Sequence, residues 1–67
     1  MSFISIVDKD GKDHWINPKN IEQISEDSYR EGGSKLYFTS GRYIEFNTDS
    51  GDVVDMIIGR MANDDFI

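Results

Sequence analysis

Three short stretches of the chain alternate between apolar and polar residues, which is the period of a β-strand with one buried face. They are residues 3–7, 36–39 and 42–46. Residues 14–16 read His, Trp and Ile, and we expect them to form the strand that returns from residues 3–7. A further strand is expected over Ser25–Tyr29. The pattern therefore predicts four or five short strands.

Turn-forming residues separate the predicted strands. Asp8–Lys12 contains Gly11, which supplies the positive φ of a tight hairpin, and Ser40 and Gly41 lie between the last two strands. Pro18 ends the strand at residue 16, because proline donates no hydrogen bond and keeps its predecessor extended. Proline also suits a first helical turn, so a short helical segment is expected over Pro18–Gln23.

A helix is predicted over residues 50–62. Asp49 or Ser50 is a suitable N-cap, and Asp52 near the start complements the positive end of the helix dipole. Five apolar residues then recur at helical period, which predicts one buried stripe. They are Val53, Val54, Ile57, Ile58 and Met61.

Together these elements predict an α+β fold. A small antiparallel β-sheet of four or five strands packs one face against the C-terminal helix. We expect residues 1–67 to form a single domain, with a flexible tail at residues 64–67. A domain of this size has a small core, so it depends on well-formed packing or self-association. The predicted core consists of Ile4, Ile6, Ile16, Ile21, Ile24, Leu36, Phe38, Ile44, Phe46, Val54, Ile57, Ile58 and Met61.

The composition excludes several kinds of site. The chain has no cysteine, so it holds neither a disulfide nor a thiolate zinc site, and the single His14 leaves no imidazole cluster for a transition metal. Apolar runs such as residues 56–58 are too short to cross a membrane. Residues 1–6 lack the basic and long apolar regions of a signal peptide. We therefore expect a cytoplasmic protein with no membrane segment.

The net charge of −6 bears on the class of partner. Proteins bind a phosphate backbone through clusters of Lys and Arg, and this chain has no such run. Direct nucleic-acid binding is therefore disfavoured, although a dimer could gather dispersed bases. Four acidic residues near the C-terminus form either a solvated face or a negative surface that docks on a basic partner. They are Asp52, Asp55, Asp64 and Asp65.

Two parts of the chain carry residue types that occur in metal or catalytic sites. Asp8–Asp13 places carboxylates around a glycine, but it lacks the further oxygen ligands of a calcium loop, so a solvated turn is favoured. His14 could act in acid–base catalysis, but no serine or carboxylate stands at a recognisable motif spacing from it. We therefore expect no enzyme activity, no catalytic or metal-binding residue, no cofactor and no small-molecule substrate.

The open face of the sheet is the predicted binding surface. One helix covers one face only, so the other face meets water or a partner. Strand alternation then turns Tyr37, Tyr43 and Glu45 outward, and Trp15 joins them if Ile16 points inward. Tyr and Trp are enriched in interface hot spots, whereas the alternative is that they only stabilise the sheet as cross-strand pairs. We expect a protein partner or self-association at this surface.

Three features of residues 11–57 occur together. A short strand is followed by Gly-Lys at residues 11–12, Ile16-Asn17-Pro18 precedes Ile-Glu-Gln-Ile at residues 21–24, and a strand pair turns at Gly41 before the final helix. In these features the chain resembles the small flagellar proteins of the FlbD family. It departs from them in an insertion at residues 29–34 and in its acidic tail. The same pattern resembles part of the β-rich DNA-binding domain of the LytTR type, whose basic residues this chain lacks.

The resemblance to the flagellar family implies an accessory or interaction role and brings no catalytic residues. The expected function is a small non-enzymatic protein-interaction module or accessory protein, acting through the open sheet face as a monomer or a homo-oligomer. Two alternatives stay open. One is a nucleic-acid-associated regulator, and the other is an acidic inhibitor or nucleic-acid mimic that acts on a basic partner protein.

Overall fold

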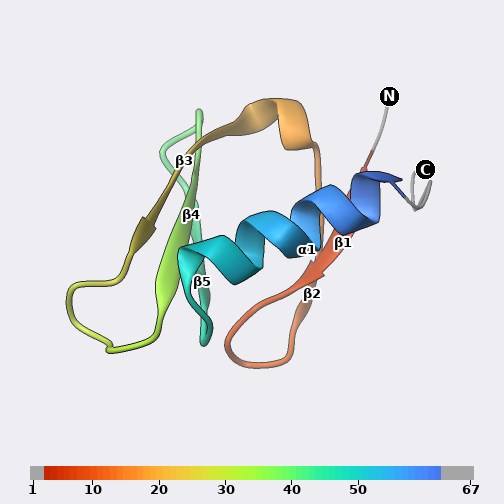
Figure 1. Ribbon diagram of the computed structural model, residues 1–67. Helices are drawn as coiled ribbons and strands as arrows, with labels where there is room; N and C mark the ends of the chain where they lie inside the picture. Colours follow the sequence, from red (N-terminus) through yellow and green to blue (C-terminus); the bar gives the residue numbers. More distant parts are fainter. Residues whose placement is uncertain (1–2, 63–67) are drawn as a thin grey trace.

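A computed structural model describes residues 3–62, and Figure 1 shows how their strands and helices are arranged. In chain order the elements are β1 (Ile4–Val7), β2 (Asp13–Ile16), the 3₁₀ turn η1 (Pro18–Asn20), β3 (Ile21–Glu26), β4 (Ser34–Phe38), β5 (Tyr43–Phe46) and α1 (Ser50–Ala62).

The strands form two antiparallel sheets, with α1 packed against both. One sheet has the order β1-β2 and the other has the order β3-β4-β5. Helix α1 runs from the three-stranded sheet to the β1–β2 hairpin and contacts β1, β3 and β4 (Figure 1). This confirms the predicted α+β class, with the five strands divided between two sheets instead of joined in one.

The break between the sheets lies at Asn17 and Pro18. The Asn17 side chain accepts a hydrogen bond from Lys19 N and caps η1, whose first residue is Pro18. Proline cannot continue a strand ladder, so β2 ends at Ile16 and η1 carries the chain across to the second sheet. Consequently β3 pairs with β4 and not with β2.

The start of β3 differs from the expectation. The helical segment predicted over Pro18–Gln23 ends at Asn20, and the strand predicted over Ser25–Tyr29 instead spans Ile21–Glu26. The register of β3 against β4 shifts between Ile21 and Gln23, as in a β-bulge. One extra residue lets Ile21 and Ile24, three positions apart, both pack against the core. Their spacing resembled that of a helix for this reason.

Both tight hairpins close in the same way. Asp8 N donates to Lys12 O and Phe38 N donates to Arg42 O, at 3.0 and 2.9 Å. Gly11 has φ +79° and Gly41 has φ +89°, a conformation that costs a residue with a Cβ atom. The two closing pairs set the register of the strands that follow, and this register decides which main-chain groups face outward.

The core lies between α1 and the inner faces of the two sheets. Its buried members are Ile4, Ile6, Ile16, Leu36, Phe46, Val53 and Ile57, and Ile21, Ile24, Phe38, Ile44 and Met56 pack against them. All nine strand residues of the predicted core therefore contribute to it. Ile16 is 8% exposed and Trp15 is 55% exposed, which settles the register of β2.

The predicted stripe of α1 is wrong at three of its five positions. Val54, Ile58 and Met61 are exposed, at 37%, 58% and 43%. Val53 and Ile57 are buried, and Met56, which was not in the predicted core, packs beside them. Successive helical residues are about 100° apart, and the rotation of α1 that brings Met56 to the core turns Val54, Ile58 and Met61 toward solvent. The residues at 54, 58 and 61 form a second apolar line on the solvent side.

The described part of the chain contains no helix long and apolar enough to cross a membrane. The tail predicted at residues 64–67 lies outside the described residues.

Candidate functional site

A groove of about 710 Å³ lies between β2 of one sheet and β5 of the other. Its lining comes from three parts of the fold. His14 and Trp15 come from β2, Tyr43 and Ile44 come from β5, and Phe38 and Arg42 flank the β4–β5 turn. Its volume is in the range of small binding sites. We call it the β2–β5 groove.

At alternate residues of β5, the main-chain N–H and C=O groups face away from β4. In an antiparallel pair, hydrogen-bonded and non-hydrogen-bonded positions alternate along the ladder. Since Phe38 and Arg42 form the hydrogen-bonded closing pair, Tyr43 and Glu45 occupy non-hydrogen-bonded positions opposite Tyr37 and Lys35. Their N–H and C=O groups therefore point to the free edge of β5. Glu45 O bears this out, because it accepts a hydrogen bond from Lys9 N at 2.9 Å.

The same alternation applies to β2. Asp8 and Lys12 form the closing pair of its hairpin, so Asp13 and Trp15 take non-hydrogen-bonded positions opposite Val7 and Ser5. The N–H and C=O groups of Trp15 therefore point away from β1. The groove thus lies beside two strand edges that present main-chain donors and acceptors, those of Trp15 and of Tyr43.

The ends of the groove are closed by hydrogen bonds between the two halves of the fold. At one end, Lys9 N bonds to Glu45 O, and Asn47 Nδ2 donates to Lys9 O at 3.0 Å. At the other end, Thr39 N donates to Asn20 O at 2.8 Å. The hairpin turn and η1 therefore hold β2 and β5 at their present separation.

The four predicted interaction residues occupy two sheets. Tyr37 and Tyr43 are direct cross-strand partners, with ring centroids 5.8 Å apart and planes tilted by 50°. Glu45 shares their outer face, and Lys35 Nζ lies 4.9 Å from the centroid of the Tyr43 ring. Trp15 belongs to the other sheet but lines the β2–β5 groove together with Tyr43. Tyr37, Tyr43 and Glu45 therefore share one outer face as predicted, whereas Trp15, predicted on the same face, lies on the other sheet across the groove from them.

Several groove residues were not predicted as binding residues. The sequence predicts Phe38 and Ile44 as core residues only, and Arg42 as the start of a strand. The available signal was the closing turn at Gly41, which brings Arg42 and Phe38 together. The sequence does not predict that these residues line the same groove as His14, because no sequence pattern places β2 beside β5.

The charge along the groove is uneven. A smaller adjoining hollow shares His14, Tyr43 and Ile44 with it, and its other lining residues are Asp8, Lys9, Asp10 and Glu45. Lys9 pairs with Asp10 at 3.7 Å, and Arg30 pairs with Glu45 at 3.6 Å. Arg42 belongs to the turn end, where Thr39 and Ser40 also line the groove. One end of the groove therefore has three carboxylates with Lys9 and Arg30 beside them, and the other end carries Arg42.

Asp8 organises the β1–β2 turn. Its Oδ1 accepts hydrogen bonds from Asp10 N and Lys12 N, at 2.8 and 3.0 Å, and His14 Nε2 lies 2.7 Å from its Oδ2. The hydrogen bond with His14, followed by that from Lys12 N, lowers the pKa of Asp8 to about 2. The carboxylate therefore holds its own turn together, and the contact with His14 fixes the imidazole beside the groove.

The fold is expected to lose stability in acid through Asp8. Its pKa is lower in the folded chain than in an unfolded one, so its contribution is complete above about pH 4 and disappears as the pH falls toward about 2. Denaturant unfolding at pH values from neutral to 2 measures this. The advantage of wild type over Asp8→Asn should shrink across that window. Asp13→Asn, in the same hairpin, is the matched control, and parallel wild-type and Asp8→Asn curves would contradict the assignment.

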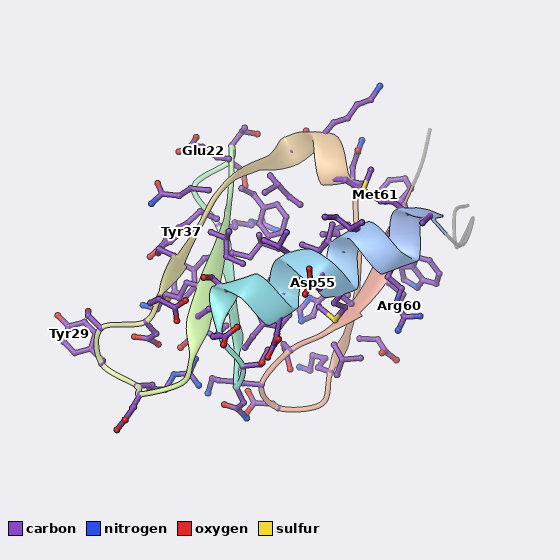
Figure 2. The ribbon with its side chains drawn as sticks, in the orientation of Figure 1. Glu22, Tyr29, Tyr37, Asp55, Arg60 and Met61 are labelled. Carbon is purple, nitrogen blue, oxygen red and sulfur yellow. The ribbon has the colours of Figure 1, made fainter. Side chains whose placement is uncertain are left out.

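The acidic residues predicted as a surface are only partly described. Asp64 and Asp65 lie outside the described residues. Asp49 Oδ1 accepts from Asp52 N at 2.9 Å and caps α1, while the Asp52 carboxylate accepts from the Thr48 hydroxyl at 2.7 Å. Asp55 is exposed on the outward side of α1 (Figure 2). Asp52 thus has a structural role at the helix start, whatever else it does.

Within residues 3–62, no three His, Asp or Glu side chains converge as metal ligands would. No protein-family model, curated protein or solved structure matches the chain.

Proposed function

We propose that this chain is a non-enzymatic protein-interaction module that binds its partner at the β2–β5 groove and the adjoining outer face of β4 and β5. The observation that carries the proposal is the placement of Trp15 and Tyr43. Each is about half exposed, at 55% and 51%, and both line the same groove. Large aromatic side chains beside a hollow are the usual anchors of protein interfaces.

Charge supports a protein partner over a nucleic acid. The chain has a net charge of −6, and three carboxylates, those of Asp8, Asp10 and Glu45, line the hollow that adjoins the groove against the cation of Lys9. Phosphate groups would be repelled by this end, whereas a segment with basic side chains would be attracted. Self-association through the same surface is one form of the proposal, and it would also supplement the small core of a short chain.

The proposal is tested with three forms of the full chain. Wild type, the double variant Trp15→Ser/Tyr43→Ser and the control Tyr29→Ser are used for affinity capture with cross-linking from a lysate of the native host. Tyr29 is 91% exposed and projects from the loop between β3 and β4, away from the groove (Figure 2). It is therefore an exposed aromatic residue outside the groove, more exposed than Trp15 or Tyr43.

We expect wild type and Tyr29→Ser to retain one specific protein that the double variant loses, with the double variant still folded by circular dichroism. Light scattering on the same proteins detects any homo-oligomer, which the double variant should no longer form. The proposal is wrong if wild type is a monomer and all three forms capture the same proteins.

A further inference from the structure

The edges of β2 and β5 specify how a partner would bind. Resting on the proposed function, we infer that the β2–β5 groove accepts an extended peptide segment of a partner protein, which pairs as an added strand. The segment carries apolar side chains at alternate positions and a Lys or Arg at the end that lies over Asp10 and Glu45.

Main-chain geometry is the first support. Trp15 on β2 and Tyr43 on β5 direct N–H and C=O groups to the free edges of their strands, and both residues line the groove. Such edges are templates for an additional strand. A segment bonded to both would join the two sheets in the order β1-β2, segment, β5-β4-β3. The strands that it would join are four residues long, and Glu45 O at one end of β5 is already bonded to Lys9 N, so the paired part is shorter than about 13 Å and centres on Trp15 and Tyr43.

The side chains around the groove are the second support. Successive side chains of an added strand point to opposite faces. One set would meet the Phe38 and Ile44 side chains, which pack against the core, and the other would meet the exposed rings of Trp15 and Tyr43. Both sets therefore meet apolar surface, which favours apolar residues in the bound segment over charged ones.

Charge sets the preference at the end of the segment. Asp10 is well exposed, and the side chain of Glu45 is 29% exposed. Each pairs with a cation only at the long distances of 3.7 and 3.6 Å, so both can accept a further hydrogen bond. A Lys or Arg placed here by the segment would find two carboxylates. Arg42 disfavours a second cation at the opposite end.

The probe is a library of random linear peptides displayed on phage and selected on the immobilised full chain. Selected sequences should share alternating apolar residues with a Lys or Arg at one end. Binding of a synthetic peptide is then followed by the fluorescence of Trp15, the single tryptophan of the chain, which should shift to shorter wavelength as the ring is covered. Selection of no peptide would overturn the inference while the lysate capture still reports on the proposed function.

Strand pairing has a signature that side-chain binding lacks. A segment bonded to both edges donates successive N–H groups alternately to β2 and to β5, so N-methylation should weaken binding about tenfold at each paired residue and little at residues outside the paired part. Tyr43→Pro removes the edge N–H, whereas Tyr43→Ala keeps it, so the proline variant should bind more weakly than the alanine variant. If the proline variant does not fold, the methylation series still decides. A flat series would overturn strand pairing and leave a protein-binding groove intact.

The charge preference is tested in the same assay. Asp10→Asn should weaken the binding of the peptide that carries Lys or Arg. It should leave unchanged the binding of the same peptide with Gln at that position. Equal losses for both peptides would contradict the placement of the cation.

Two competing occupants of the groove are tested by direct measurement. Quenching of Trp15 by oligothymidylate would favour a nucleic acid, and a dimer that the peptide dissociates would favour a second copy of the chain, and either result overturns a partner-protein segment.

Discussion

Phe46→Ala is expected to destabilise the fold by about 3–5 kcal/mol, the usual cost of truncating a buried phenylalanine. Phe46 is 2% exposed and lies in the core beside Leu36 and Val53. Its carbonyl also accepts a hydrogen bond from Arg30 Nη2 at 3.0 Å, so the residue joins β5 to the loop before β4. A chain of 67 residues has about 3–10 kcal/mol of stability in total, so the variant should lose a large part of its free energy of unfolding.

Tyr43→Ala is the control for this prediction. It truncates an aromatic residue of the same strand, but Tyr43 is 51% exposed. Its loss removes the pairing with Tyr37, which is worth about 0.5–1.5 kcal/mol. Urea unfolding followed by circular dichroism compares the two variants. Similar losses in both would mean that Phe46 does not hold the core as described. The folded state of Tyr43→Ala is also what makes it usable in the binding experiments.

Ile57→Ala is expected to cost about 2–5 kcal/mol, and Ile58→Ala less than about 0.5 kcal/mol. The two residues are adjacent and chemically identical, but Ile57 is 9% exposed and Ile58 is 58% exposed. The pair therefore isolates the rotation of α1 from its helical propensity, which changes equally in both variants. Thermal unfolding in parallel measures the difference. Equal destabilisation, or a larger loss for Ile58→Ala, would mean that α1 presents its other apolar line to the sheets.

The strands were predictable because a period of two leaves only two choices of face. Once Leu36 was assigned to the inside, Phe38 followed it, and Tyr37 had to point outward. The helix was less constrained. Val53 and Val54, like Ile57 and Ile58, are adjacent apolar pairs, and either member of each pair completes a stripe. Only the positions of β1, β3 and β4 decide between them, and these positions depend on contacts between distant parts of the chain.

The groove was beyond the reach of local patterns for a related reason. Trp15 and Tyr43 were both predicted to be outward-facing residues, but they were assigned to one continuous face. Pro18 was recognised as the end of a strand, whereas its consequence, a break between two sheets, depends on how η1 directs the chain toward β3. The free edges of β2 and β5 arise from this break. The prediction thus identified the aromatic residues and missed the groove that they line.

The pairing pattern of the strands also bears on how the chain folds. Every paired strand has its neighbour along the chain as a partner: β1 with β2, β3 with β4, and β4 with β5. Such pairs close short loops, and hairpins of this kind form within microseconds. The contact of α1 with β1 instead closes a loop of nearly the whole described chain. We therefore expect the rate of folding to be governed by the docking of α1 on β1, after the hairpins have formed.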